Sequence, residues 1–325
     1  MKKLLLTALI GLGSFTYANV NAVVSILPQQ TFLKKIGGDK VNIALMVKPG
    51  SSPHAYEPKP SQMRDISKAN IYFTVGVEFE HNWIEKFQNQ NKSMLVKDMG
   101  KNIAKIDMEE HSHHDHEEEG HEEHEEKGHD DHEKHDDHDE HDGHDDHDDH
   151  AKENHEDHHD EHDEDGKDPH IWTIPANVKI MATNIFNELS NIDKENTAYY
   201  KVNLETFLKE INHTDKTIKN LLKDTPKHSK FMVFHPAWGY FAKEYDLEQL
   251  AIEAGGKNPK PKQIAFLIKE AKEEKVRAVF TAPEFSTSTA NQIAREVGAP
   301  VIKVSPLNPN WSENLIGLAQ AISGK

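Results

Sequence analysis

The chain of 325 residues contains no cysteine. A disulfide framework is therefore excluded, and we expect no lipid anchor, because there is no cysteine to accept one after an export signal. Any metal site in this protein must also be built without thiolate, which leaves imidazole, carboxylate and water as its principal donors.

Long apolar runs are also lacking. The longest one near the N-terminus, Leu4 to Leu12, follows Lys2 and Lys3 and is too short to span a bilayer. This pattern is typical of a Sec signal peptide, which we assign to residues 1–22. Cleavage could follow Ala18 or Ala22, and we favour Ala22. The sequence thus predicts an exported protein of a bacterial periplasm that does not span the membrane.

Charge is distributed unevenly along the chain. The formal net charge is −18, but residues 109–168 alone carry 31 acidic and 4 basic side chains. The remainder has 34 basic and 25 acidic residues and is mildly basic. Its lysines and arginines are scattered, and the acidic segment would repel phosphate, so we expect no nucleic-acid partner.

The acidic segment is also rich in histidine, with 18 of the 24 histidines of the chain. It has no apolar side chain larger than Ala151 between His111 and Asp168, so it cannot bury a core, and we predict a disordered insertion over 109–167. Imidazole and carboxylate are common metal ligands, which favours metal capture over a merely solvated linker. The auxiliary weak ligands would be His111, His113, His114, His116, His121, His124, His129, His132, His135, His138, His141, His144, His147, His150, His155, His158, His159 and His162.

Outside the insertion, short apolar strands alternate with helical patterns, which is typical of an α/β fold with parallel sheets. We predict two lobes, each a small parallel sheet flanked by helices, joined by a long helix. The expected strands cover 23–27, 41–47, 71–75, 94–97, 230–234, 247–252, 277–281 and 301–304. The expected domains are an N-terminal lobe over 23–108, completed by 168–194, a linking helix over 195–224 and a C-terminal lobe over 225–325.

Three of the remaining histidines, His54, His170 and His235, each stand where a strand or the acidic segment gives way to a turn beside proline. Ligands of open parallel sheets bind beyond the carboxyl ends of the strands. Three imidazoles that converge there could hold Zn²⁺ and leave a fourth position open. An isolated histidine is more often a hydrogen-bonded structural residue, so spacing alone does not decide. We assign such structural roles to His81, His213 and His228.

Four motifs in a fixed order carry a more specific signal. They are SPHAYEPKPS at 52–61, DPHIW at 168–172, FHPAWGYF at 234–241 and VFTAPE at 279–284. Together with the insertion before the second motif, they resemble the periplasmic metal-binding proteins of ABC importers (cluster A-I), and the zinc-specific ZnuA type most closely. The resemblance spans nearly all of the mature chain.

This resemblance implies two four-stranded lobes joined by a rigid helix, with the metal held between them by His54, His170 and His235. Manganese-type members carry a carboxylate where His235 stands, and three imidazoles favour Zn²⁺ on chemical grounds as well. Many members place a further carboxylate in the loop that is 304–309 here, but this chain has none. The fourth ligand is then water or Glu284, although Glu284 could instead orient a ligating imidazole.

Trp172, Trp238 and Tyr240 would wall such a site and limit access of water, although aromatic residues beside a turn more often serve packing alone. The resemblance has functional implications as well. It implies a monomeric, high-affinity receptor that binds Zn²⁺ as its transported ligand and delivers it to a membrane permease with a cytoplasmic ATPase. Two alternatives remain open. One is a zinc buffer that acts through the insertion. The other is a zinc hydrolase with Glu284 as its base, although no HExxH pattern is present and we expect no enzyme.

Overall fold

The computed structural model describes residues 19–108, 166–253, 257–285 and 287–325. The proposed signal segment up to residue 18 lies outside the described residues. So does the predicted insertion between 109 and 165, with all 18 of its histidines. The two ends of the chain next to the insertion are joined at its base, where Asp107 and Lys167 form an antiparallel bridge and an ion pair of 2.6 Å.

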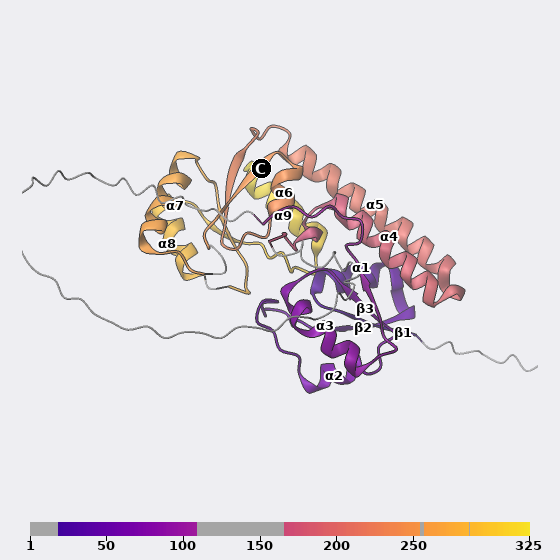
Figure 1. The fold of residues 1–325 in the computed structure, drawn as a ribbon. Helices are drawn as coiled ribbons and strands as arrows, with labels where there is room; N and C mark the ends of the chain where they lie inside the picture. The colour runs from indigo at the N-terminus through magenta and orange to yellow at the C-terminus, as the bar shows by residue number, and fades with distance from the viewer. Residues whose placement is uncertain (1–18, 109–165, 254–256, 286) are drawn as a thin grey trace, which may run out of the picture. The chain divides into compact units, whose positions relative to one another are not determined.

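The N-terminal half contains a parallel sheet of four strands, β1 (Val20–Val24), β2 (Val41–Leu45), β3 (Ile71–Thr74) and β4 (Leu95–Asp98), in the order β2-β1-β3-β4 (Figure 1). The inner strands β1 and β3 are largely buried and almost entirely apolar, as expected where helices cover both faces of a parallel sheet. The sequence predicts that the N-terminal lobe begins at residue 23, but its sheet begins earlier, because Val20 already pairs with Val41.

The C-terminal half repeats this arrangement with β5 (Ser229–Val233), β6 (Leu247–Ala251), β7 (Val279–Thr281) and β8 (Val301–Lys303), in the order β6-β5-β7-β8. All eight predicted strands are therefore confirmed, with shifts of up to three residues at their ends. In both sheets the strand order reverses between the first and third strand, which creates a topological switch point at the carboxyl edge.

The helices surround and connect the two sheets (Figure 1). Prolines at the first or second position begin four of them, and glycines in the left-handed conformation follow the last two, as helix boundaries favour. The helices are α1 (Leu27–Gly37), α2 (Pro60–Ile66), α3 (Glu78–Gln90), α4 (Pro175–Ile192), α5 (Thr197–Leu222), α6 (Gly239–Glu244), α7 (Pro261–Glu273), α8 (Ser288–Val297) and α9 (Trp311–Ser323).

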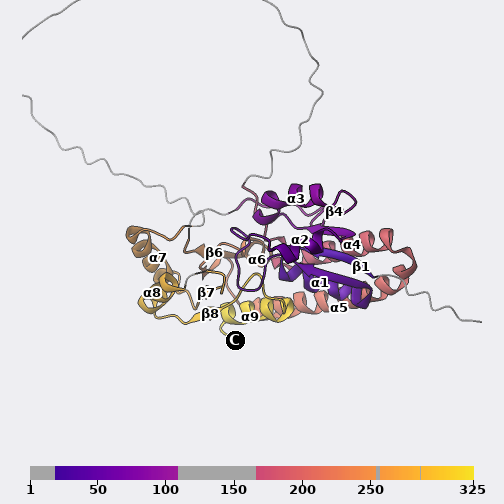
Figure 2. The same ribbon diagram turned by 90° about the horizontal axis from the view of Figure 1, so that it is seen from below.

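The predicted long helix is α5, which has 26 residues and packs against α1, α4 and α9 (Figure 2). Its buried face follows a spacing of three and four residues, as an amphipathic helix requires. Phe32 of α1 contacts both Phe207 of α5 and Trp311 of α9, with ring centroids 5.7 and 5.6 Å apart. The linking helix therefore shares one apolar core with elements of both halves.

Two helices differ from expectation, and both matter for the site. The sequence predicts a helix over Asn82 to Asn89, but helix α3 begins at Glu78, four residues earlier. Helix α6 was not predicted, because six residues are too few to show a period and Pro236 and Gly239 around its start suggest a turn. Among the described helices, none has the length and apolar composition needed to cross a membrane.

Candidate metal centre

The structure brings His54, His170 and His235 together. His54 lies in the loop between β2 and α2, His170 lies just before a 3-10 turn, and His235 follows β5 by two residues. The ring centroids of His54 and His235 are 5.2 Å apart, and those of His170 and His235 are also 5.2 Å apart. His235 is thus the middle ring of three neighbouring imidazoles that come from three distant parts of the chain.

The three rings are neighbours, but they do not yet enclose a common point. Within the described ranges, no three His, Cys, Asp or Glu side chains have the arrangement of a formed metal site. The rings stand at 69° and 72° to one another, edge toward face. Convergence on one ion therefore requires a small rotation or approach of at least one imidazole.

Each of the three imidazoles is paired with a carboxylate through the same ring atom, Nδ1. When Nδ1–H donates to a carboxylate, Nε2 keeps its lone pair and is available to bind a metal ion. The carboxylate also fixes the orientation of the ring. The pairs are His54 with Glu78 at 2.8 Å, His170 with Asp168 at 2.7 Å and His235 with Glu253 at 2.5 Å.

The Nε2 atom of His235 is buried and has no hydrogen-bond partner among the described residues. Burial lowers the pKa of His235, and although the hydrogen bond to Glu253 opposes this shift, the nearby rings of His170 and His54 add to it. The ring is therefore neutral near pH 7. An unpartnered buried nitrogen costs about 1–3 kcal/mol, which a metal ion bound through this lone pair would offset.

The three pairs differ in exposure. His170 and His235 are buried, as are their partners Asp168 and Glu253. His54 and Glu78 instead have 39% and 57% of their side-chain surface exposed. Two imidazoles are thus held by buried hydrogen bonds, whereas the third sits on an accessible loop.

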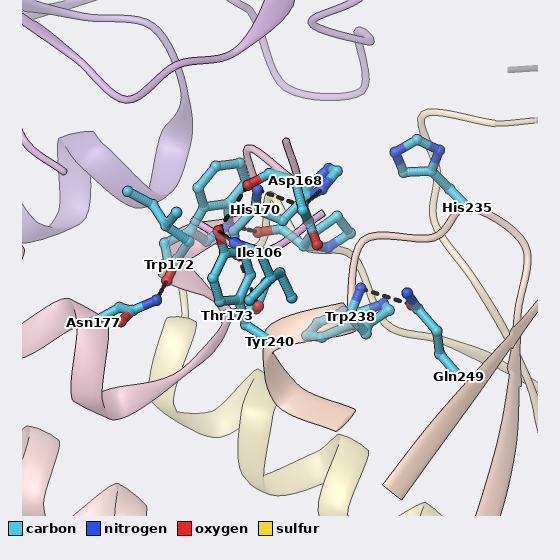
Figure 3. A network of polar contacts seen from close by, with 12 residues as sticks. Ile106, Asp168, His170, Trp172, Thr173, Asn177, His235, Trp238, Tyr240 and Gln249 are labelled. Carbon is cyan, nitrogen blue, oxygen red and sulfur yellow. Dashed lines mark hydrogen bonds and ion pairs between the residues drawn. The ribbon is translucent and has the colours of Figure 1, made fainter. Parts of the chain in front are cut away.

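Several contacts fix the turn that carries His170 (Figure 3). Asp168 Oδ1 accepts a second hydrogen bond from the backbone N–H of His170 at 2.8 Å, and Thr173 Oγ1 donates to the His170 carbonyl at 2.9 Å. Trp172 Nε1 donates to the Pro306 carbonyl at 2.7 Å. Both the side chain and the backbone of His170 are therefore restrained.

The three aromatic residues expected to wall the site make different contacts from one another. The Trp172 ring lies 5.4 Å from the His170 ring, in direct contact. Trp238 packs edge-to-face against Phe241, and Tyr240 Oη donates a hydrogen bond to the Asp168 carbonyl. A fourth aromatic ring was missed by the sequence reasoning: Phe285 stacks on His235 at 4.6 Å and 21°.

Glu284 does not take the orienting role expected for it. The carboxylates that pair with the three imidazoles are Glu78, Asp168 and Glu253. Both carboxylate oxygens of Glu284 instead lie within hydrogen-bond distance of Ser305 Oγ, at 3.0–3.1 Å. Burial raises the pKa of Glu284. Of the histidines given structural roles, His228 pairs with Glu248 on the surface at 3.1 Å.

Sequence reasoning identifies neither Glu78 nor Glu253, and it includes Asp168 only as the first residue of the DPHIW motif. Glu253 lies two residues beyond the end of β6 and Glu78 four residues beyond β3. Both therefore occupy the carboxyl edge of a sheet, the same signal that selected the histidines. A search for carboxylates at strand ends would have found them.

Comparisons with known proteins identify relatives that bind zinc. The family model described as "Zinc-uptake complex component A periplasmic" matches residues 22–322. The zinc-binding protein AdcA of Streptococcus pyogenes is 26% identical over 292 residues, which cover 89% of this chain and 50% of AdcA. The present chain thus spans about half the length of AdcA.

Two further relatives match over more of their own length. The high-affinity zinc uptake system protein ZnuA of Bacillus subtilis is 27% identical over 285 residues, or 86% of this chain and 76% of that protein. A crystal structure of ZnuA is 33% identical and has a TM-score of 0.74, covering 94% of this chain and 98% of the other. The fold described above is therefore shared over almost the entire chain.

The Glu253 carboxylate gives a first test of the site. Because it orients His235 and keeps Nε2 free, Glu253→Gln should lower zinc affinity by about 10- to 100-fold, as loss of a partner hydrogen-bonded to a ligand does elsewhere. The measurement is competitive titration with a zinc chelator. The matched control is Glu248→Gln, on strand β6 just before Glu253, because the partner of Glu248, His228, is exposed. Equal affinities of the two variants would contradict the assignment.

Proposed function

Because the chain belongs to the zinc-uptake complex component A family, we propose that it is an extracytoplasmic receptor that captures Zn²⁺ and delivers it to an ABC-transporter permease with a cytoplasmic ATPase. The observation that carries this proposal is the group of three neighbouring imidazoles, each paired through Nδ1 with a carboxylate. Zn²⁺ suits such a set of nitrogen donors, which offers few hard oxygens to Mn²⁺.

The proposed protein ligands are Nε2 of His54, His170 and His235. His54 belongs to the N-terminal half and His235 to the C-terminal half, so the ion would lie in a cleft between the two halves. The fourth position goes to water or to Glu284. The Glu284 carboxylate accepts a hydrogen bond from Ser305. Ser305 lies in the loop 304–309, where many members of the family carry a carboxylate.

Release of the ion requires the transporter to remove at least one ligand. His54 is the ligand with the fewest restraints, because its ring and its partner Glu78 are both exposed. A shift of the loop between β2 and α2 would withdraw His54 and leave His170 and His235 in place. Two imidazoles bind Zn²⁺ far less tightly than three, so the ion would then pass to the permease.

The predicted insertion between 109 and 167 would help to capture Zn²⁺. Many weak imidazole and carboxylate contacts on a tethered segment raise the local concentration of Zn²⁺ beside the site. A buffer that acts through the insertion alone is the second candidate function. The paired imidazoles favour the receptor, since a buffer would need no such arrangement in the folded part.

A zinc hydrolase would need a general base beside a metal-bound water. The sequence offers Glu284 as a candidate, but the carboxylates that pair with the three imidazoles are Glu78, Asp168 and Glu253. We therefore propose a binding function without catalysis. Metal-dependent turnover that disappears in Glu284→Ala would favour the hydrolase instead.

Competitive zinc titration separates the receptor from the buffer. Deletion of residues 112–165 should leave one tight site, whereas His235→Ala should abolish it, and His228→Ala serves as the surface control. Affinity should also fall in acid, because protons compete with the metal for neutral imidazole. Since burial lowers the pKa of His235, its protonation should begin only below the usual histidine pKa of about 6.5. Tight binding that vanishes with the insertion and ignores His235 would instead identify a buffer.

The position of strand β1 bears on where the proposed signal peptide is cleaved. Cleavage after Ala22 would remove Val20 to Ala22 from β1, where Val20 and Ala22 are buried and paired with Val41 and Ile43. We therefore propose Ala18 as the cleavage site, in place of Ala22, so that the mature chain begins at Asn19. Intact-mass analysis of the exported protein distinguishes the two sites, and a chain that begins at Val23 would refute this choice.

A further inference from the structure

Helix α6 begins four residues after His235, and its first two residues contact the carboxylate partner of His170. Tyr240 Oη donates to the Asp168 carbonyl at 2.9 Å and accepts from the Ile106 N–H at 3.2 Å (Figure 3). Burial raises the pKa of Tyr240 to about 12, so the hydroxyl keeps its proton for this donation. One phenol thus links α6 to both chain segments at the base of the insertion.

The same two segments are also joined to each other. The Asp168 N–H donates to the Ile106 carbonyl at 2.9 Å, and the Met108 N–H donates to the Gly166 carbonyl at 2.8 Å. Asp168 therefore uses its N–H and its carbonyl to hold the base of the insertion, and its carboxylate to hold His170. Displacement of its backbone would move the carboxylate as well.

Gly239 touches the other end of Asp168. A Cβ atom at position 239 would lie 2.9 Å from Asp168 Oδ2 and 3.3 Å from Gln249 Nε2. The distance of 2.9 Å to Asp168 Oδ2 is shorter than a Cβ atom tolerates. Asp168 is buried and restrained by its hydrogen bonds, so it cannot easily move away. Only glycine allows α6 to approach the carboxylate this closely.

From these contacts we propose that Gly239 and Tyr240 are positioning residues of the zinc site, which fix Asp168 and, through it, His170 relative to His235. The inference rests on the proposed function and adds a mechanism to it. Because α6 continues directly from the His235 turn, one short helix connects two of the three imidazoles. The two buried ligands are then held as a unit before the ion arrives, which lowers the entropic cost of binding.

The proposal is tested in the full mature chain with two variants and two matched controls. Tyr240→Phe removes the hydroxyl, and Gly239→Ala pushes on the Asp168 carboxylate without loss of a hydrogen bond. The control for the first is Tyr245→Phe, which loses a comparable bond from Tyr245 Oη to Asp215 at 3.2 Å. The control for the second is Gly317→Ala in α9, where an added Cβ meets nothing within 4 Å.

Competitive zinc titration should show a loss of about tenfold at the tight site in Tyr240→Phe and Gly239→Ala, the lower end for disturbance of a ligand's hydrogen-bonded partner. The controls should stay within about twofold of the parent. Co²⁺ serves as a second probe, because its visible absorption reports ligand geometry. Its spectrum at the tight site should change in the two variants and not in the controls.

Three results are decisive. If both variants match their controls, or if affinity falls only alongside thermal stability with an unchanged Co²⁺ spectrum, α6 has a merely structural role and the inference is wrong. If Tyr240→Phe and Gly239→Ala lower affinity and alter the spectrum, the inference holds. A parent protein without a tight site that depends on His235 would refute the proposed function itself, which is a separate outcome.

Discussion

The site depends on one repeated interaction, the hydrogen bond from an imidazole Nδ1 to a carboxylate. It occurs at His54, His170 and His235, and in each case it leaves Nε2 without a proton. At His235 the consequence is most direct, because Nε2 is buried without a partner and burial keeps the ring neutral. The fold thus sustains an unfavourable buried lone pair that a metal ion would satisfy.

The repeated strand order explains how distant segments reach this place. Each sheet reverses its strand order between its first and third strand, and residues that follow the strands gather at that carboxyl edge. His235 follows β5 there, and His54 follows β2 in the other sheet. Helix α5 packs on α1, α4 and α9. Residues of both halves therefore belong to one hydrophobic core.

Much of this could be predicted from the sequence, for physical reasons. Buried parallel strands read as short apolar runs, and α5 shows the helical period over 26 residues, so both could be recognised without a structure. The three histidines stood out by their ordered motifs. Helix α6 could not be found in this way, because six residues show no period, and the start of α3 at Glu78 was placed four residues late.

The partners of the histidines were harder to predict. Glu78 and Glu253 lie 24 and 18 residues from the histidines they bind, in separate segments of the chain, and no local pattern marks the pairing. Glu284 stands out by its motif, yet its carboxylate accepts from Ser305 and pairs with none of the three imidazoles. The predicted disorder and metal capture of the insertion fall outside the described residues and stay predictions.

The most direct measurement is anomalous diffraction at the zinc edge from crystals of the mature protein loaded with one equivalent of Zn²⁺. The account predicts one dominant peak, about 2.0–2.1 Å from Nε2 of His54, His170 and His235, with the three Nδ1 hydrogen bonds retained. A dominant peak that lacks His235 as a ligand, or that is bound through an Nδ1 atom released from its carboxylate, would contradict it.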